Sequence, residues 1–533
     1  MVYDFSILSW YELSGVDVAQ VRRDPFFQKA GEEVKYIFTD VPDQMYIERY
    51  QKLGLRREQM LSMHAFMTGK TDISGSISAS DWIAGYMKIQ PNISVIRDEN
   101  SIEIKIQNQR VMTMFLREDG ESFYAINYYE YEKLIAREVY ADRLLWTFHY
   151  VTAQNENGSY ARLSRTTFYD ADGRICFELL PGGDIDIAKN MRIGLSADAR
   201  DYEKYIFPDG EVLTKPEFLK RFLEALHMTK DDMIFIDRPM RLAFIQPLFE
   251  MHSEAPIYLF LHSGHYYLPG EDPDAIFWNK EYYYYFKNAD RIRAFIVSTK
   301  EQKKDLQERM KDYGLKCPDV YVIPVSGIPG IERPQSPRKP YSIMTASRLI
   351  GRKGMDIMIK AVIRAHETVP ELTFDIYGKG PDEYVDSLKQ IIAAADAGDY
   401  IRFMGRQIMN GVYPKYEVYL TAAQWETLGL SLMEAVAAGQ ALIGFDVRYG
   451  NKVFIRDGEN GVRIPMTIEQ ISSPKFYDAC VVQMADAICE VFKDRKRMKK
   501  YEKKSYEIAE EYLDERIAEK WLELLENVDK ERR

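Results

Sequence analysis

Short apolar runs alternate with helical segments between residues 321 and 510, and this alternation constrains the fold of the chain most strongly. The apolar runs lie at residues 341–347, 372–378, 400–405, 416–423 and 441–447. Between them, the segment 355–366 has a helical period, and a further helix is expected to begin near Gly429. Alternation of this kind is typical of a parallel sheet with crossover helices.

Residues 195–320 show the same alternation, with apolar runs at 233–238, 255–263 and 294–299. Residues 60–190 differ, because polar and apolar residues alternate there between turn signals such as DEN, EDG and DADG. This pattern predicts a meander of antiparallel strands with one solvated face. We therefore predict an α/β fold of two Rossmann-like domains that face a cleft, with an antiparallel β-meander inserted in the N-terminal domain.

The predicted domain boundaries follow these changes in pattern. Residues 1–59 and 191–320 form the N-terminal Rossmann-like domain, 60–190 the inserted meander, and 321–510 the C-terminal Rossmann-like domain. Residues 511–533 are expected to form a charged amphipathic helix that crosses back to the N-terminal domain. A chain of 533 residues is also too long for one hydrophobic core, which favours two or three domains.

Composition and charge exclude several classes of function. The net charge of −11 argues against a protein that mainly grips the phosphate backbone of nucleic acid. We see neither a secretory leader nor a long uncharged apolar stretch, so we expect a cytoplasmic protein and leave association with the membrane periphery open. The four cysteines lack CxxC spacing and indicate neither a zinc site nor a disulfide framework.

Two glutamates with seven residues between them, Glu426 and Glu434, straddle a predicted strand-to-helix junction. The spacing places one carboxylate in the loop and the other two turns down the helix. Backbone N–H groups of residues 427–430 would point outward at the helix start, where the helix dipole favours an anion. The spacing alone also fits a surface glutamate. However, Glu434 lies in an apolar run, where an unpaired carboxylate is costly to bury, and a ribose diol is a natural partner.

A second candidate cluster, Arg348 and Lys353, follows the apolar run that ends at residue 347. An arginine and a lysine five residues apart on a loop can converge on a pyrophosphate, the arginine as a fork and the lysine as a point charge. Cations there would stabilise a departing nucleoside diphosphate. Basic loop residues are usually just solvated, so the basic pair indicates a binding site only together with the two glutamates.

Three further signals are weaker. Gly15 follows a short strand and opens a helix, where a glycine lets a phosphate approach the backbone closely. His262 ends an apolar run and could hydrogen-bond a sugar hydroxyl, although a structural histidine is an equal alternative. The segment 184–186, DID, has the form of a metal-binding DxD motif but lies in the meander, so we expect no metal site.

Together these motifs resemble the family four type of retaining, two-Rossmann glycosyltransferases, in which the pair of glutamates and the basic pair are shared. The likeness is closer to the bacterial enzymes that start glycosylation of serine-rich repeat adhesins, which the accessory Sec system exports. It covers essentially the whole chain and is carried by SGVD, KYIFTDV, RTTFYDADG, HSGHY, NADRIRAFIVST, TASRL, ELTFDIYG, YEVYLTA, GLSLMEA and LIGFDVRYGN. The resemblance implies a GT-B fold, with the acceptor held mainly by the N-terminal domain and a UDP-sugar mainly by the C-terminal domain.

The resemblance also implies roles for individual residues. His262, Arg348, Lys353 and Glu426 would be catalytic, with the two cations on the pyrophosphate and His262 near the donor sugar ring. The donor would also contact Gly15, Val16, Asp17, Arg406, Gln407, Thr427, Leu428, Gly429, Leu430 and Glu434. The family usually has E-G-F-G-L where this chain has Glu426-Thr-Leu-Gly-Leu, and Trp425 replaces a small or polar residue. Both departures leave the identity of the transferred sugar open.

The implied activity is transfer of N-acetylglucosamine, or glucose, from a UDP-sugar to serine or threonine hydroxyls of a serine-rich repeat adhesin. No metal or other cofactor is expected, because the cations and the helix start would neutralise the leaving diphosphate. The resemblance suggests front-face attack, with a UDP oxygen taking the proton of the hydroxyl. A companion glycosyltransferase-like subunit, or a homo-oligomer, is expected as partner, and the meander would extend the acceptor surface or join subunits.

Two alternatives remain open from the sequence. One is glucosylation of a polyol-phosphate polymer such as teichoic acid, which related enzymes with similar meanders perform. The other is a catalytically inactive subunit that presents an adhesin to a partner enzyme. An inactive copy has no physical reason to keep the two glutamates and the basic pair, which argues against the second alternative.

Overall fold

The computed structural model describes residues 1–6, 15–41, 44–155, 158–182, 202–237, 242–251, 253–266, 282–466 and 474–532. Apart from the last two residues, the chain divides into two compact units. The first comprises residues 1–260 and 280–293, and the second comprises residues 261–279 and 294–531. Within the described residues, no helix is both long and apolar enough to cross a membrane.

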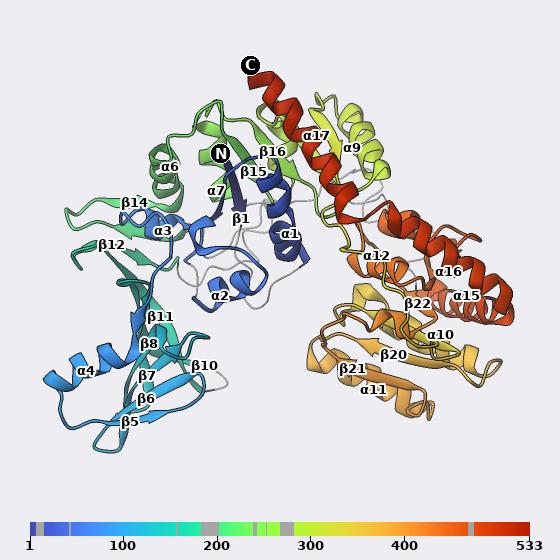
Figure 1. Cartoon of the computed structure of the whole chain (residues 1–533), viewed down its shortest axis with the longest axis horizontal. Helices are drawn as coiled ribbons and strands as arrows, with labels where there is room; N and C mark the ends of the chain where they lie inside the picture. Colours follow the sequence, from blue (N-terminus) through green and yellow to red (C-terminus); the bar gives the residue numbers. More distant parts are fainter. Residues whose placement is uncertain are drawn as a thin grey trace. The chain divides into compact units, whose positions relative to one another are not determined.

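A parallel sheet forms the core of the first unit. Its strands follow the order β16-β15-β1-β2-β3, and their bounds are β1 Val2–Ser6, β2 Val34–Phe38, β3 Met60–Ser62, β15 Met233–Ile236 and β16 Ile257–Phe260. The helices of this unit are α1 Gly15–Lys29, α2 Gln44–Lys52, α3 Met63–Phe66, α4 Ala79–Ile89, α6 Lys215–Ala225, α7 Leu242–Glu250 and α8 Tyr283–Lys287 (Figure 1). Every described side chain of β15 and β16 is buried, as expected for a parallel sheet covered on both faces.

A buried ion cluster ties α1 to this sheet. The guanidinium of Arg23 donates to Asp4 of β1 at 3.0 Å and to Asp237, directly after β15, at 2.6 Å. Burial and the nearby charge of Asp237 raise the pKa of Asp4 to about 7. Removing either partner from such a cluster would leave a buried charge uncompensated, so the cluster fixes α1 against the two central strands.

The meander of the first unit is an antiparallel sheet of strands in the order β14-β13-β12-β11-β10-β9-β8-β7-β6-β5, with β4 paired to β8. The bounds are β4 Ile77–Ser78, β5 Ser94–Arg97, β6 Ser101–Ile106, β7 Gln109–Leu116, β8 Ser122–Glu130, β9 Lys133–Tyr140, β10 Leu144–Asn155, β11 Gly158–Tyr169, β12 Ile175–Leu180, β13 Lys204–Ile206 and β14 Val212–Thr214. The sheet thus continues past residue 190 into β13 and β14. These short strands have weak apolar signals, so the sequence grouped them with the parallel domain.

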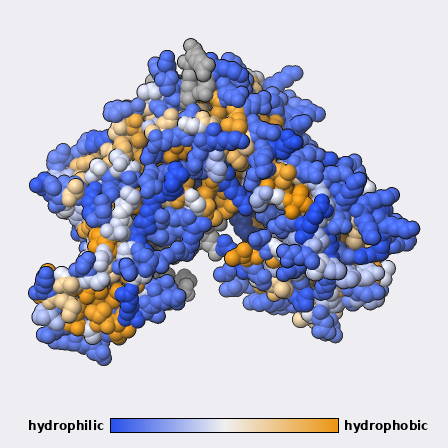
Figure 2. Space-filling view, in the orientation of Figure 1, coloured by the Kyte–Doolittle hydropathy of each residue, from blue (hydrophilic) through white to orange (hydrophobic). Residues whose placement is uncertain are grey.

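One end of this sheet exposes apolar side chains. Met87 and Ile89 of α4 and Val95 and Ile96 of β5 are between 43% and 81% exposed. Figure 2 shows apolar surface over the end of the sheet that carries α4 and β5. The opposite side of α4 packs on the sheet through residues such as Trp82, which lies edge-on to Phe123.

His64 connects the meander with the parallel part of the first unit. Ser62 caps α3 directly after β3, and this short helix places the His64 ring in a stack with Phe168 of β11, Tyr205 of β13 and Phe218 of α6, at centroid distances of 5.2, 5.8 and 5.8 Å. The hydroxyl of Tyr205 lies 3.2 Å from Nε2 of His64. Burial, with the charge of Lys215 as the second cause, lowers the pKa of His64 to about 3.

The second unit contains the paired parallel strands β17 Ala294–Val297 and β18 Asp319–Val322, with α9 Lys300–Asp312 between them, and a six-stranded parallel sheet. The six strands follow the order β21-β20-β19-β22-β23-β24, with bounds β19 Ser342–Ala346, β20 Thr373–Tyr377, β21 Ile401–Gly405, β22 Val418–Thr421, β23 Ala441–Phe445 and β24 Gly461–Ile464. The helices are α10 Met355–His366, α11 Asp382–Ala394, α12 Leu430–Ala437, α13 Gly450–Phe454, α15 Pro474–Lys493, α16 Arg495–Glu510 and α17 Asp514–Arg532.

Successive side chains of these strands enter two different cores, because side chains alternate across a strand. Ile343 and Leu420, for example, pack with α10, α11 and α15 on one face. Met344, which follows Ile343, and Tyr419, which precedes Leu420, pack with α12 and α16 on the other face of the sheet (Figure 1). Burial on both faces explains why these strands read as continuous apolar runs in the sequence.

The five apolar runs that the sequence showed between residues 341 and 447 coincide with β19 to β23, whereas β24 was not predicted. The expected helix 355–366 coincides with α10, and the expected helix near Gly429 is α12. The C-terminal amphipathic helix is α17, which begins at Asp514. The domain boundaries, and the return of this helix to the N-terminal domain, remain predictions.

The buried His64 predicts a loss of stability in mild acid. Its folded pKa of about 3 lies below the ordinary value of 6.5, so protonation favours the unfolded chain and stability falls as the pH drops below 6.5. Between pH 7.5 and 5.5, urea unfolding followed by tryptophan fluorescence should show a free energy loss about 1.4 kcal/mol larger for the unsubstituted chain than for His64→Gln. An equal loss in both proteins would contradict this role of His64.

Candidate active site

The candidate site lies at one edge of the six-stranded sheet of the second unit. All strands of this sheet are parallel, so the loops after β19, β20, β21 and β22 emerge at the same edge, which we call the carboxyl edge. Ligands of such sheets bind beyond this edge. The loops place here the predicted residues Arg348, Lys353, Arg406, Gln407, Glu426, Thr427, Leu428, Gly429 and Leu430, and α12 adds Glu434.

An ion pair joins the two loops that carry the strongest sequence signals. Nζ of Lys353 lies 2.5 Å from Oε2 of Glu426, with 18% and 23% of the two side chains exposed. The backbones of the loops also meet, because the amide of Gln424 donates to the carbonyl of Arg352 at 3.1 Å. Residues 73 positions apart in the sequence are therefore in direct contact at the carboxyl edge.

Two glycines allow this contact. Gly354 has a φ of 62°, and a Cβ there would lie 2.6 Å from the carbonyl oxygen of Ala422. Gly429 has a φ of 85°, and a Cβ there would lie 2.9 Å from Cγ of Glu426. Both positions demand a left-handed backbone and a close approach, so only glycine fits them without strain.

The backbone of Glu426 is fixed by the loop after β23. Its amide donates to the carbonyl of Arg448 at 3.0 Å, and its carbonyl accepts from the amide of Gly450 at 2.8 Å. The carboxylate of Glu426 is thus held at a defined place above the sheet, where it faces Lys353.

Arg348, Arg406 and Gln407 are exposed on neighbouring loops of the same edge. The loop that carries Arg348 packs on the turn after β20, since the amides of Ser347 and Leu349 donate to the carbonyls of Tyr377 and Lys379 at 3.1 and 3.0 Å. Gln407 donates through its side chain to the carbonyl of Met404 at 2.8 Å. The structure therefore brings the three residues to the predicted edge.

Glu434 lies in the second turn of α12 and is half-buried. The sequence spacing placed it two turns down the helix, and this was wrong, because the helix begins at Leu430 and Glu434 lies only about one turn into it. Tyr413 is buried in the same core as the apolar side chains of α12. Burial and the negative charge of Glu434 raise the pKa of Tyr413 well above its usual value, so the phenol stays protonated.

The loop that carries His262 packs against the loop of Glu426. Gln302 of α9 holds this loop by donating to the carbonyls of Leu261 and Ser263 at 2.9 and 3.3 Å. Gly264 then lies so close to Trp425 that a Cβ there would be 1.8 Å from Cζ2 of the indole. Trp425, which departs from the family pattern, immediately precedes Glu426. Its indole therefore lies between the His262 loop and the Glu426 loop.

A second contact binds the same loops. The guanidinium of Arg448 lies 4.3 Å from the ring centroid of Tyr266 and 3.4 Å from Asp305, to which the hydroxyl of Tyr266 also donates at 3.1 Å. Burial raises the pKa of Tyr266 to about 12. Since Arg448 accepts the amide hydrogen bond of Glu426 through its carbonyl, this contact supports the backbone of the site.

In the first unit, Gly15 opens α1, as the sequence predicts. Asp17 is buried in the first turn of α1 and accepts a hydrogen bond from the hydroxyl of Tyr50 at 2.6 Å. This contact fastens the helix start to α2. The donor contacts of Gly15, Val16 and Asp17 remain predictions.

No cluster of three or more histidine, cysteine, aspartate or glutamate side chains that could hold a metal ion occurs among the described residues. The DID segment at 184–186 lies outside the described residues. What the carboxyl edge does offer is a cationic pair, Arg348 and Lys353, and the amide groups at the start of α12. Such a set suits a phosphorylated ligand and the charge that develops on a leaving diphosphate.

Comparisons with known proteins identify the family of the chain. Residues 331–508 match the family of glycosyl transferases group 1. The chain is 32% identical over 529 residues to the UDP-N-acetylglucosamine--peptide N-acetylglucosaminyltransferase GtfA subunit of Streptococcus gordonii, covering 99% of this chain and 98% of that protein. The chain belongs to the GtfA family of glycosyltransferases.

Solved structures of GtfA proteins have the same fold. The pneumococcal O-GlcNAc transferase GtfA, crystallised in complex with UDP and GlcNAc, matches with a TM-score of 0.82 at 32% identity over 99% of this chain and 98% of that chain. A GtfA/B complex matches with a TM-score of 0.80 at 31% identity over 99% of both chains. The GT-B fold with two Rossmann-like domains, and the resemblance to enzymes of this family, are thus confirmed.

Sequence reasoning missed two buried tyrosines beneath the site of this GtfA-family chain. The charge of Glu434 helps to raise the pKa of Tyr413, and Tyr419 of β22 donates to Ser431 Oγ of α12 at 2.8 Å. Burial raises the pKa of Tyr419 to about 12. No spacing in the sequence links these tyrosines to α12, because the contacts cross between a strand, a short turn and a helix.

The close approach at Gly264 predicts a sensitive position in this GtfA-family chain. Gly264→Ala forces the indole of Trp425 to move, and the adjacent Glu426 with it, so we expect glycosyl transfer to fall roughly 10-fold or more, since small misplacements of catalytic groups are costly. Transfer and the melting temperature should be measured on the full chain. Gly398→Ala is the matched control, because a Cβ at this exposed glycine meets nothing within 4 Å. Equal activity in both variants would contradict the prediction.

Proposed function

We propose that this chain transfers N-acetylglucosamine from UDP-N-acetylglucosamine to serine and threonine hydroxyls of a serine-rich repeat protein, with retention of configuration. The observation that carries the proposal is the Lys353–Glu426 pair at the carboxyl edge of a GtfA-family domain. The name of the Streptococcus gordonii relative states a UDP-N-acetylglucosamine donor and a peptide acceptor. The pneumococcal relative binds UDP and GlcNAc. These relatives favour N-acetylglucosamine over glucose.

The cations would act on the leaving group. Arg348 and Lys353 neutralise the charge that grows on the diphosphate as the sugar bond breaks, and the amides at the start of α12 add their partial positive charge. Lys353 now faces Glu426 at 2.5 Å, so an incoming diphosphate shares this cation with the carboxylate. Because these groups supply the positive charge, the reaction needs no metal ion.

The other residues of the edge would bind and orient the donor. Glu426, with residues 427–430, contacts the sugar, and Glu434 accepts hydrogen bonds from the ribose diol. Arg406 and Gln407 meet the uracil through their backbone, and His262 lies near the sugar ring. The resemblance also assigns donor contacts to Gly15, Val16 and Asp17 of the first unit. These assignments rest on the family resemblance and on the placement of the second-unit residues at the carboxyl edge or on the adjacent His262 loop.

The acceptor hydroxyl would attack from the same face as the leaving UDP. One UDP oxygen takes the proton of the hydroxyl while the bond from the sugar carbon to UDP breaks and the bond to the acceptor oxygen forms. This path needs no carboxylate nucleophile and retains the configuration at the sugar carbon. A companion subunit of the GtfB type supports acceptor binding in our proposal, as the related GtfA/B complex suggests.

Removing either member of the ion pair tests the site. We expect Glu426→Gln and Lys353→Ala to lower transfer by roughly 100-fold or more, because each removes an electrostatic contact to the sugar or the leaving group. Transfer to a serine-rich repeat peptide is measured with radiolabelled donor, alone and with a GtfB-type companion, while hydrolysis of the donor and the melting temperature are followed separately.

The matched control for Lys353→Ala is Lys389→Ala, which removes an exposed ion pair with Asp386 on α11, in the same sheet domain. Because exposed ion pairs contribute little, this variant should keep its activity. Full transfer by Glu426→Gln or Lys353→Ala would refute the site assignment.

A panel of donors and acceptors tests the substrates. We expect UDP-N-acetylglucosamine to be used in preference to UDP-glucose, and a serine-rich repeat peptide in preference to a teichoic polymer. All reactions contain EDTA, because the cationic edge replaces a metal in our proposal. Transfer only to the teichoic polymer would favour a polyol-phosphate acceptor, no release of UDP would favour an inactive binding subunit, and activity restored only by manganese would refute the metal-free reaction.

A further inference from the structure

The position of the Glu426 backbone follows that of the loop after β23. The amide of Glu426 donates to the carbonyl of Arg448 at 3.0 Å. The carbonyl of Glu426 accepts from the amides of Tyr449 and Gly450 at 2.5 and 2.8 Å. Gly450 also lies against the Glu426 loop further on, since a Cβ there would be 1.8 Å from the carbonyl oxygen of Leu428. A shift of the loop after β23 therefore carries Glu426 with it.

The side chain of Arg448 ties this loop to α9. Its Nη1 lies 3.4 Å from Oδ2 of Asp305, and its guanidinium carbon lies 4.3 Å from the ring centroid of Tyr266. The hydroxyl of Tyr266 donates to the same carboxylate oxygen at 3.1 Å, so the three side chains contact one another. Only 18% of the Arg448 side chain and 21% of the Asp305 side chain are exposed. This ion pair is therefore better shielded from water than the exposed surface pairs that contribute little to stability.

A second ion pair fixes the same stretch of chain on the same helix. Nζ of Lys452, in α13, lies 3.0 Å from Oε1 of Glu301. On α9, Glu301 and Asp305 are four residues apart and therefore share one face of the helix. Arg448 and Lys452 have the same spacing. Two acidic groups of α9 thus face two basic groups at matched positions, which favours one docking position of the loop on the helix.

The helix α9 is a fixed base for these contacts. Thr299 caps its first turn, because its hydroxyl accepts from the amide of Gln302 at 3.0 Å. The side chain of Gln302 accepts from the amide of Ser298 at 3.0 Å and donates to the carbonyl of Leu261 at 2.9 Å. Leu306, on the next turn, is fully buried. The two ion pairs therefore join the loop after β23 to a helix that is itself anchored at both its start and its buried face.

We propose that Arg448 is a positioning residue for glycosyl transfer, whose side chain, held on α9, fixes the loop that carries the backbone of Glu426. The proposal rests on the proposed function, in which Glu426 contacts the donor sugar. In this role Arg448 acts through Glu426 and not on the substrate itself. Loss of its side chain leaves the carbonyl that accepts from Glu426 in the chain but no longer holds it in one place.

The test is a double-mutant cycle on the full-length chain. Arg448→Met, which keeps a long side chain but removes its charge, should lower the kcat of transfer roughly 10-fold, because a small displacement of a catalytic group is costly. In the Glu426→Gln background the same substitution should change kcat by less than about 2-fold, because the carboxylate through which Arg448 acts is already gone. The affinity for UDP, measured by titration calorimetry, should change by less than about 3-fold in Arg448→Met, because UDP lacks the sugar.

Two further variants separate the ion pair from the bulk of the arginine. Asp305→Asn removes the charge that faces Arg448, so it should also lower kcat, and again only while Glu426 is present. Arg448→Lys keeps a cation beside Asp305 and should retain at least about a third of kcat, although it loses the planar contact with Tyr266. If Arg448→Met does not fold, the cycle with Asp305→Asn decides in its place.

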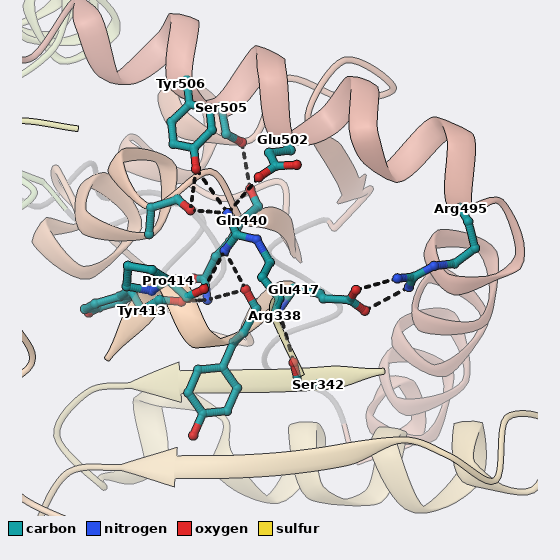
Figure 3. A network of polar contacts seen from close by, with 12 residues as sticks. Arg338, Ser342, Tyr413, Pro414, Glu417, Gln440, Arg495, Glu502, Ser505 and Tyr506 are labelled. Atoms are coloured by element: carbon teal, nitrogen blue, oxygen red, sulfur yellow. Dashed lines mark hydrogen bonds and ion pairs between the residues drawn. The ribbon is translucent and has the colours of Figure 1, made fainter. Parts of the chain in front are cut away.

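Arg495→Met is the matched control, because a similar set of side chains holds the opposite edge of the same sheet. Figure 3 shows the guanidinium of Arg495 on the carboxylate of Glu417, with contacts of 2.5 and 2.8 Å. The guanidinium carbon of Arg495 also lies 5.4 Å from the ring centroid of Tyr341. Glu417 and Tyr341 directly precede β22 and β19, so these contacts lie at the amino edge, away from the candidate site. We expect a similar loss of melting temperature and an unchanged kcat.

The outcomes separate this inference from the proposed function. If Glu426→Gln lowers transfer and Arg448→Met does not, the positioning role is refuted and the candidate site stands. If Glu426→Gln keeps full transfer, the site assignment itself falls, and the positioning role falls with it. An equal loss caused by Arg448→Met in both backgrounds, or by Arg495→Met, would also refute the positioning role, because the effect would then not pass through Glu426.

Discussion

In a parallel sheet every strand ends at the same edge, and the site of this protein depends on that constraint. Lys353 follows β19, Glu426 follows β22, and Arg406 follows β21, so three separate stretches of sequence reach one place. The order of the strands puts β19 next to β22, which is why Lys353 and Glu426 can form an ion pair. The alternation of strand and helix thus determines the neighbourhood of the charged groups before any side chain is considered.

Close backbone approaches then convert that neighbourhood into a defined geometry. The Lys353 and Glu426 loops meet only because Gly354 and Gly429 leave room for a carbonyl and a carboxylate side chain. The indole of Trp425 fills the space above Gly264 and joins the His262 loop to the same assembly. Arg338 and Gln440 fix the backbone of the segment 413–416, whose tyrosines pack in the same core as α12.

Much of this could be predicted from the sequence, because the signals are local. Strands that are buried on both faces appear as continuous apolar runs, and α10 has a clear helical period, so β19 to β23 and α10 were foreseen, whereas β18 and β24 were not. The basic pair and Glu426 were found because they directly follow such runs. The extent of the meander was less clear, since β13 and β14 contain only three residues each and carry little periodic signal.

The depth of Glu434 in α12 and the buried tyrosines near it were not accessible in the same way. The helix begins at Leu430, as expected, so Glu434 lies about one turn into it rather than the two turns that the spacing from Glu426 suggested. Tyr413 and Glu434 come from two elements, and no local pattern records that the charge of Glu434 raises the pKa of Tyr413. The sequence by itself determined the sheet, the family and the chemical types at its edge, because periodicity and residue type are properties of short segments. Only the tertiary structure decided which of these groups touch and which buried residues hold them, because those distances depend on how strands, glycines and helices pack.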